Sequence, residues 1–478
     1  MANKLYEESD VQAIATAIRA KNGSSNTYKV SQMAAAINDL PSGTTISNGR
    51  IVEKEHSLYS SYGNAPIPAG KFVQFAHFLS TDLYGDGGNH FDAAPLSSSS
   101  FLIASYRNYS STYRITAIVG SVSGNTIEYG TMQEMQISSY PNYIKIVKIS
   151  ESEALLLYKI STSVYCVSIS INGTEIQFGT PETILNNGMS YSRIEAILFN
   201  TNTIVLLNAI NSALQLLPFQ YNNGVYSIGE PTVVYNSYTS AYSFCETSTQ
   251  DMLIIYTGTN QSFCCKAATL SGTTITLGNE TVIDSSFNGA FYFCCHNYDD
   301  GKAIIFYKSY AITSSLVYRV ITVDGTNVTL GTLNGMVSPT YCIGDGIKVC
   351  KVSGKQFFIS AYDSVANLHT ILGTFNDSDR LTVNKHDTFV YNRNSSYGSI
   401  PIVMNSSLVI LFTGDTGIDT YKSGRIACAQ FNIVGTSYSI YSKVQLPVNT
   451  INGCKKIDGF TLEEITTSTP GDVYVFNG

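Results

Sequence analysis

The side chains best suited to chemistry in this chain are its cysteines, histidines and carboxylates, and none of them forms a recognisable catalytic motif. The sequence holds no Gly-x-Ser-x-Gly elbow, no Gly-x-x-x-x-Gly-Lys-Ser/Thr loop and no His-Glu-x-x-His pair. The histidines are scattered, without a pair at metal-ligand spacing: His56, His77, His90, His296, His369 and His386. We therefore expect no catalytic residues, no metal site and no cofactor.

The ten cysteines form neither a disulfide framework nor a Cys-x-x-Cys motif. Two adjacent pairs occur, Cys264-Cys265 and Cys294-Cys295. Neighbours in a strand point to opposite faces, so the two thiols of a pair cannot line one metal site. The pattern predicts reduced, partly buried thiols.

The carboxylates leave one enzymatic alternative open. Acidic turns such as 299–301 and 377–379 lack the alternating spacing that wraps a loop around calcium, which favours solvated turns. The Ser-x-Asp-x-Gly-x-Thr-Trp turns of propeller sialidases are excluded, because the chain has no Trp. Two carboxylates that the fold brings together could still hydrolyse a glycoside, since such pairs are spatial and not sequential.

The composition predicts β-strands and argues against nucleic acid and anionic membranes as partners. Charged residues make up 13% of the chain, while Tyr occurs 33 times, and Tyr suits half-exposed pleated surfaces. The net charge of −7 without a Lys/Arg cluster argues against nucleic acid and anionic membranes as partners. A polar start and the lack of a run of 18 apolar residues predict a product made in a cytoplasm, without signal peptide or membrane insertion.

Two signals repeat seven times in the same order, with successive copies about 50 residues apart. The first is an apolar strand that follows a turn, at residues 101–106, 154–158, 203–208, 252–256, 303–307, 356–361 and 407–412. The second is a short alternating strand between two glycines, at 124–130, 173–179, 224–229, 272–278 and 325–331, with degenerate copies at 378–385 and 435–441.

Each repeat has room for four antiparallel strands, which is the size of one propeller blade. The predicted fold is all-β, a seven-bladed β-propeller of four-stranded blades over residues 71–450. Residues 44–70 are predicted as a linker with strands, and 451–478 as a closing β segment. Residues 67–73 and 457–475 look like two halves of a small flanking β module, with the propeller inserted between them. The alternative is that one of these strands completes the outer blade and closes the ring.

The first 43 residues have helical periodicity. Ser9 and Gln12 form a capping box. Two narrow apolar stripes follow, which predict a helical hairpin for attachment or oligomerisation: Val11, Ile14 and Ile18, then Val30, Met33, Ile37 and Leu40.

These N-terminal residues resemble a known family. The segment 10–23, with a helix that ends in the turn Lys21-Asn22-Gly23, is followed by a second helix carrying Ser31-Gln32-Met33-Ala34. This order is similar to the N-terminal motif of tail fibre and baseplate-associated proteins from phages and prophages of Gram-positive gut bacteria. The C-terminal residues 457–475 resemble a closing β motif of phage structural proteins, although Phe460-Thr461 departs from its usual residues. The resemblance implies a virion protein that attaches to other tail proteins through its N-terminus, is commonly trimeric, and displays its propeller to the host cell.

Topology selects one propeller face for binding. The links between blades lie on the same face as the loops between the two middle strands, and these connections are rich in aromatic residues. Tyr provides rigid contact area with a hydroxyl, as in binding loops, although several of these residues would equally pack between blades. The receptor-binding candidates are Tyr109, Tyr140, Tyr143, Tyr191, Tyr235, Tyr238, Tyr242, Phe287, Tyr310, Tyr341, Tyr391, Tyr397 and Tyr421.

The leading hypothesis is a phage tail-tip or tail-fibre protein that binds a bacterial surface glycan or S-layer protein and is not an enzyme. Two alternatives stay open: a tail-borne polysaccharide depolymerase, and a purely structural baseplate component.

Overall fold

The computed structural model describes most of the chain between residues 91 and 441, and strands on either side of it. The described stretches are 91–109, 112–124, 126–186, 188, 193–237, 239, 241–285, 293–309, 315–335, 347–362, 368–389, 399–415, 425–441, and the strands β1 (Glu53–Leu58), β2 (Phe72–Ala76), β3 (Leu79–Tyr84), β37 (Lys443–Pro447), β38 (Gly459–Thr461) and β39 (Gly471–Val475). The predicted N-terminal helices lie outside these residues. Within them, no helix is long and apolar enough to cross a membrane.

Contacts divide the chain into two units, one of Met1–Ser80 with Tyr441–Gly478 and one of Thr81–Ile440. The first unit contains a five-stranded sheet in the order β1-β39-β38-β2-β37. Its strands therefore come from both ends of the chain, and the second unit is inserted between them.

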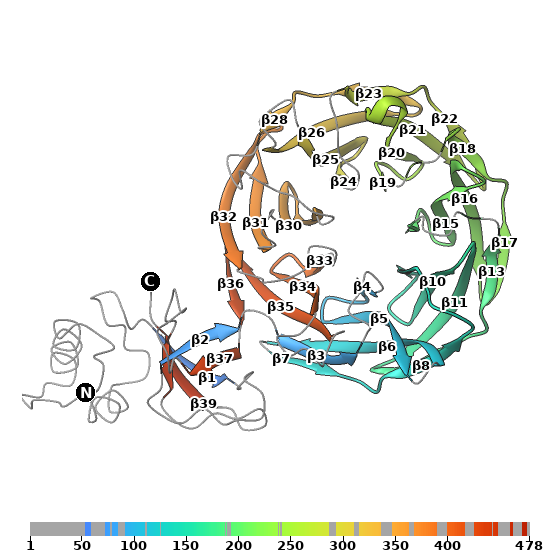
Figure 1. The fold of residues 1–478 in the computed structure, drawn as a ribbon. Coiled ribbons are helices and arrows are strands. Elements are labelled where there is room, and N and C mark those ends of the chain that lie inside the picture. Colours follow the sequence, from blue (N-terminus) through green and yellow to red (C-terminus); the bar gives the residue numbers. More distant parts are fainter. Residues whose placement is uncertain are drawn as a thin grey trace, which may run out of the picture. The chain divides into compact units, whose positions relative to one another are not determined.

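The second unit is a ring of seven antiparallel sheets (Figure 1). This confirms the predicted all-β propeller with seven four-stranded blades. The inner strands are β4 (Phe91–Pro95), β9 (Tyr143–Lys148), β14 (Glu195–Leu198), β19 (Tyr242–Glu246), β24 (Phe293–Asp299), β29 (Lys348–Ser353) and β33 (Ser399–Asn405). The second strands are β5 (Ser100–Tyr109), β10 (Glu153–Ile160), β15 (Thr203–Ile210), β20 (Asp251–Thr257), β25 (Lys302–Ser309), β30 (Gln356–Tyr362) and β34 (Leu408–Asp415). The third strands are β6 (Thr112–Ser123), β11 (Ser163–Asn172), β16 (Ala213–Asn222), β21 (Phe263–Ser271), β26 (Ser315–Asp324), β31 (Leu368–Phe375) and β35 (Arg425–Val434).

The outer strand is broken into two segments in blades 1 to 5, and both segments pair with the third strand. These segments are β7 (Thr126–Tyr129) with β8 (Gln133–Ile137), β12 (Glu175–Phe178) with β13 (Glu182–Leu185), β17 (Val225–Ile228) with β18 (Thr232–Tyr235), β22 (Thr274–Leu277) with β23 (Thr281–Asp284), and β27 (Asn327–Leu330) with β28 (Asn334–Gly335). Blade 6 has one continuous outer strand, β32 (Leu381–Phe389). In blade 7 both β36 (Ser437–Tyr441) and β3 pair with β35, so a strand from before blade 1 closes the ring.

The two repeated glycines have different physical reasons. The first, as at Gly272 with φ +61°, lies in the left-handed region at the turn before the outer strand, where glycine has no steric penalty. The second stands where the outer strand breaks. At Gly278 the amide donates to the carbonyl of Ala267, and a Cβ would lie 1.9 Å from the carbonyl oxygen of Thr326 in the next blade. At Gly278 the second glycine therefore allows a hairpin of the neighbouring blade to approach, whereas at Gly179 and Gly331 the nearest atoms belong to the same blade, to Ser168 and Val320.

The core consists of apolar layers between neighbouring blades. One layer joins blades 1 and 2 and contains the fully buried Leu102 and Leu156, each worth about 1.5–3 kcal/mol of burial. Adjacent cysteines serve different layers: Cys264 packs between blades 3 and 4, and Cys265 between blades 4 and 5. Blade 7 meets blade 1 through the rings of Phe101 and Phe412, whose centroids are 5.3 Å apart.

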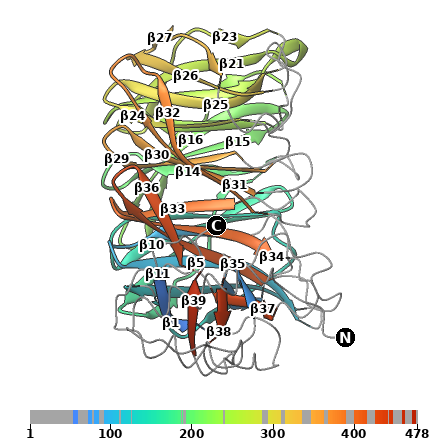
Figure 2. The ribbon, with the colours of Figure 1, turned by 90° about the vertical axis from the view of Figure 1, so that its left-hand side faces the viewer.

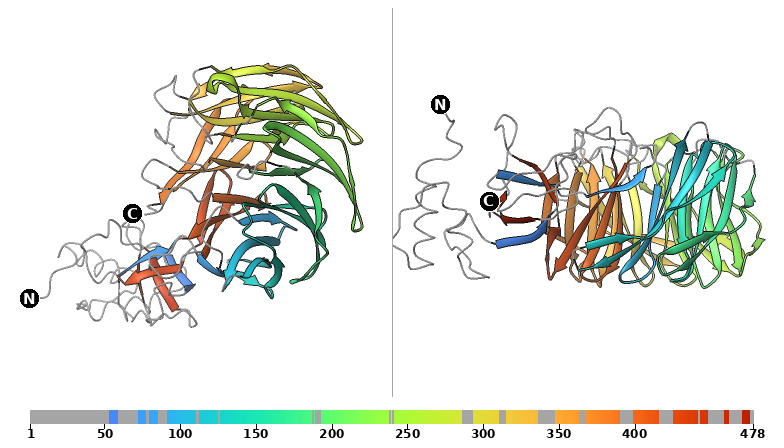
Figure 3. Two further views of the ribbon diagram at one scale, coloured as in Figure 1. Left: turned by 45° about the vertical axis from the view of Figure 1, so that its right-hand side comes forward. Right: turned by 90° about the horizontal axis from the view of Figure 1, so that it is seen from below.

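The strand order gives the ring two distinct ends, because the blade strands run along its axis (Figures 2 and 3). We call one end the link face. It carries the links between blades, such as residues 138–142, and the connections between second and third strands. The other end, the turn face, carries the short connections such as 149–152 and 173–174.

Candidate ligand-binding site

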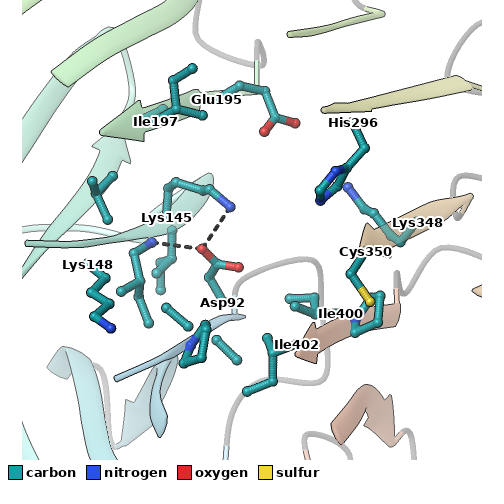
Figure 4. A pocket seen from close by; sticks show the side chains of 18 of the residues that line it. Asp92, Lys145, Lys148, Glu195, Ile197, His296, Lys348, Cys350, Ile400 and Ile402 are labelled. Carbon is teal, nitrogen blue, oxygen red and sulfur yellow. Dashed lines mark hydrogen bonds and ion pairs between the residues drawn. The ribbon is translucent and has the colours of Figure 1, made fainter. Parts of the chain in front are cut away.

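A cavity of about 750 Å³ lies on the axis of the propeller, and each of the seven inner strands contributes to its lining. This volume is within the range of small-molecule sites, about 300–1,000 Å³. The cavity wall is partly charged and partly apolar. Ile400 and Ile402 of β33 form one side, and Lys145, Glu195 and Lys348 point inward from other blades (Figure 4).

One position of each inner strand lies at the same level along the axis. The register defines it, because in every blade this residue pairs with the fifth residue of the second strand. Lys145 pairs with Leu157, Glu195 with Leu207 and Lys348 with Ser360. Around the ring this position holds Asp92, Lys145, Glu195, Ser243, Cys294, Lys348 and Ile400. All of them except Ser243 and Cys294 line the cavity. The position lies near the start of each inner strand, so this level of the cavity is closer to the link face.

Two ion pairs order the charges at this level. The carboxylate of Asp92, 7% exposed, accepts the backbone amide of Ile146 at 2.7 Å and pairs with the amine of Lys145 at 3.1 Å. The guanidinium of Arg193, two residues before β14, lies 3.1 Å from a carboxylate oxygen of Glu195, the first residue of that strand. Each carboxylate thus has a cation of its own.

Lys348 differs from these neighbours. Its side chain is half-buried, and among the described residues it forms no hydrogen bond or ion pair. Burial lowers the pKa of Lys348, and the positive charge of Arg193 lowers it further. Burial also raises the pKa of Glu195, but Arg193, Lys348 and Lys145 outweigh that effect and hold it below its ordinary value. The cavity is therefore positive at its centre.

Buried polar side chains hold Arg193 in place. Its carbonyl oxygen accepts a hydrogen bond from the side-chain amide of Asn208 at 2.6 Å, and another from the hydroxyl of Tyr242 in blade 4. Asn208 in turn accepts from the amine of the fully buried Lys159 at 3.3 Å. This network connects blades 2, 3 and 4 just behind the cavity.

The aromatic residues predicted to bind a receptor differ from one another in exposure. Tyr140 is 39% exposed and packs edge-on against Tyr106, with ring centroids 4.8 Å apart. Tyr143 and Tyr235 are half-buried, and Tyr109 is the last residue of β5. The prediction that Tyr242 contacts a receptor is corrected: its side chain is fully buried and donates a hydrogen bond to the carbonyl of Arg193, so it presents no contact surface. The remaining candidates lie outside the described residues: Tyr191, Tyr238, Phe287, Tyr310, Tyr341, Tyr391, Tyr397 and Tyr421.

The sequence reasoning missed the charged residues of the cavity. These residues share a constant distance in sequence from the start of the second strand of their blade. Lys145 is eight residues before Glu153, the first residue of β10, and Lys348 is eight residues before Gln356, the first residue of β30. Comparing this single position across the seven repeats would have revealed four charged side chains in otherwise apolar strands.

Cysteines and metal ligands contribute no further site in the described part of the chain. Its cysteines are free thiols, and burial raises the pKa of Cys265 and of Cys294 to about 12. Among the same residues, no group of three or more His, Cys, Asp or Glu side chains is arranged to hold a metal ion.

Comparison with known proteins identifies the fold. No family model and no curated protein matches the sequence. Among solved structures, the BP39L lectin of Burkholderia pseudomallei is similar over 76% of this chain and 99% of its own, at 9% identity and a TM-score of 0.52. Two others are a protein from Lactobacillus plantarum (73% and 97% covered, 9% identity, TM-score 0.47) and Sqt1 from Chaetomium thermophilum (83% and 98%, 10%, 0.46). At these identities the likeness concerns the fold alone.

Proposed function

We propose that this chain is a glycan-binding protein whose ligand enters the axial cavity from the link face. The observation that carries the proposal is the convergence of Lys145, Glu195 and Lys348 in a cavity of small-molecule size, at the level nearer to that face. Charged groups beside the apolar side chains of Ile400 and Ile402 suit a sugar, which offers hydroxyls on its rim and C–H groups on its ring faces. A lectin of the same fold is a precedent for this use of a propeller.

The N-terminal resemblance supplies the biological setting of the proposal. We infer a phage tail-tip or tail-fibre protein that attaches to the virion through residues 1–43 and recognises a surface glycan of a Gram-positive host. An S-layer protein is the other receptor considered. If these residues also assemble trimers, light scattering should give three chains for the full-length protein and one for a variant lacking them; an equal mass for both would contradict that assembly.

Binding of the labelled full-length protein to intact Gram-positive cells and to their purified wall polysaccharides tests the function. We expect saturable binding to one polysaccharide, and Tyr140→Ser should weaken it, since this side chain is exposed at the link face. Val225→Ser is the matched control, because Val225 is 68% exposed next to a turn-face hairpin. Lack of binding at micromolar concentration to every cell and polysaccharide would leave only the structural baseplate role.

One observation favours depolymerase activity as a second function. Glu246 lines the same cavity as Glu195, and burial raises its pKa whereas neighbouring cations lower that of Glu195. Glycoside hydrolysis needs an acid and a base or nucleophile, which are two carboxyl groups with pKa values moved apart and within about 5–10 Å of each other. Glu195 begins β14 and Glu246 ends β19, so the activity also requires that a bound chain reach both ends of the cavity. Release of reducing ends from the bound polysaccharide, abolished by Glu246→Gln, would establish this activity. Intact polysaccharide after prolonged incubation would exclude it.

A further inference from the structure

The charge of the axial cavity is opposite in sign to that of the whole protein. The chain has a net charge of −7. The cavity, however, is lined by five cationic side chains and three carboxylates. The cations are Lys145, Lys148, Arg193, Lys348 and Lys351, and the carboxylates are Asp92, Glu195 and Glu246. Low-dielectric walls concentrate such a local field and attract ligands of opposite charge.

The carboxylates and carbonyls of the protein that contact these cations do not neutralise all of the positive charge in the cavity. Asp92 is occupied by Lys145 and the amide of Ile146, and Glu195 by Arg193. Lys351 is directed to the carbonyl of Tyr298 at 2.6 Å. Lys348 is left without a hydrogen-bonding partner among the described residues, although it is half-buried and near other cations. The charge of Glu195 favours its protonated form, but burial and the neighbouring cations outweigh that effect and lower the pKa of Lys348. Burying an ammonium group without a partner is costly, so a bound anion would relieve that cost.

We propose that the ligand is a sugar or polyol unit that carries one anionic group, a carboxylate or a phosphate, and that Lys348 binds this group with Lys145 and Arg193 beside it. The carboxylate of Glu195 is placed to accept hydrogen bonds from neighbouring hydroxyls, and Ile400 and Ile402 form an apolar wall for the carbon skeleton (Figure 4). This inference rests on the proposed glycan-binding function and adds the chemical class of the ligand.

The test is calorimetric titration of the full-length protein with small probes in matched pairs. Methyl β-D-glucuronide is compared with methyl β-D-glucoside, and glycerol 3-phosphate with glycerol. We expect saturable binding of one anionic probe, at least about tenfold tighter than its neutral counterpart, as for a charge-assisted hydrogen bond. The glucuronide arm and the phosphate arm separate the two possible sources of the charge.

Variants assign the effect to the cavity. Lys348→Met should weaken binding of the anionic probe about tenfold or more, whereas Lys348→Arg should retain most of it. Lys355→Met is the matched control from the same blade, because Lys355 pairs with Asp377 at 3.0 Å near the turn face; its binding should equal that of the wild type. Lys348→Arg also keeps the test decisive if the Met variant folds poorly.

Three results would overturn the inference: no binding of either anion, equal binding of charged and neutral probes, or undiminished binding by Lys348→Met. Each is distinct from failure of the proposed function. A protein that binds wall polysaccharide but fails these tests recognises a neutral glycan. One that binds the anionic probe through Lys348 but binds no cell or polysaccharide has the ligand site without the proposed biological role.

Discussion

The two faces of the propeller are built under different constraints. Turn-face hairpins are short and repeat the same residues, because a left-handed turn favours a glycine such as Gly272, and the approach of a hairpin of the next blade favours a second one such as Gly278. On the link face the hairpins between second and third strands can be equally short, as at 161–162, but the links between blades differ in length from blade to blade, as 138–142 and 236–241 show. Backbone geometry therefore sets the sequence of the turn face, whereas the link face is free to vary.

This difference separates the repeat from the site. The residues that made the seven-fold pattern recognisable hold the blades together, while the charged residues of the cavity break the pattern from blade to blade. Lys145, Glu195 and Lys348 occupy equivalent positions in three repeats and carry unlike charges. A repeated scaffold thus presents an asymmetric centre, which suits one ligand on the axis better than seven equivalent ones.

The largest effect is expected for Gly278→Ala, where a turn-face hairpin of blade 5 meets the outer strand of blade 4. The new Cβ would meet the carbonyl oxygen of Thr326 at 1.9 Å, which is backbone and cannot rotate away. The blades must separate, so the free energy of unfolding should fall by about 3 kcal/mol or more. Urea unfolding measured by fluorescence checks this. A loss below about 1 kcal/mol would show that blades 4 and 5 adjust and that the second glycine is not a packing requirement.

A smaller, pH-dependent effect is expected behind the link face, for Lys159→Met. Lys159 is fully buried, and burial lowers its pKa to about 8 from 10.5. Between these values the unfolded chain binds a proton that the folded chain does not, so wild-type stability rises with pH relative to the variant. From pH 7 to pH 10 the free energy of unfolding of the wild type should increase by about 2 kcal/mol relative to that of Lys159→Met. A pH-independent difference in urea midpoints would mean that Lys159 keeps an ordinary pKa.

Tyr242→Phe is expected to cost about 1 kcal/mol, the value of one buried hydrogen bond. Because that bond positions Arg193, ligand affinity should also fall by a few-fold. Tyr256→Phe is the matched control: its hydroxyl is bonded to Glu280 at 2.5 Å, and Glu280 does not line the cavity. Tyr256→Phe should lose at least as much stability, because its hydroxyl bonds a carboxylate, and only Tyr242→Phe should lose affinity. Equal affinities in calorimetry would show that Asn208 alone fixes Arg193.

The architecture was predictable from sequence because its signals have local causes. Apolar second strands and paired glycines identify a blade without knowledge of its neighbours, which is why five regular copies and two degenerate ones gave the correct number of blades. In the degenerate copy of blade 6 the turn contacts the neighbouring blade through a hydrogen bond: Asp379 accepts it from the hydroxyl of Tyr298 of blade 5 at 2.8 Å. Closure by β3 was not predicted, because a single strand has no repeat to reveal its partner.

The site was less predictable because it depends on residues brought together around an axis. Composition drew attention to Tyr, yet the role of each Tyr depends on its burial. On the same face Tyr242 is buried and Tyr140 is exposed. Sequence distance also conceals the cavity: Lys145 and Lys348 are four blades apart in the chain but line one cavity. Only the register of each inner strand shows that they share a level.

The smallest effect is expected for Gly272→Asn, and it separates the two glycines of one hairpin. Gly272 has φ +61° and no atom within 4 Å of the position of a Cβ, so it needs only tolerance of the left-handed region. Asn adopts this region more readily than other residues with a Cβ, and the urea midpoint should correspond to a loss below about 0.5 kcal/mol. Gly272→Val is the control, since a β-branched residue should cost more than about 1 kcal/mol there. If Asn proved as damaging as Val, the first glycine would be required for packing as well, and the two glycines of the turn face would not have separate roles.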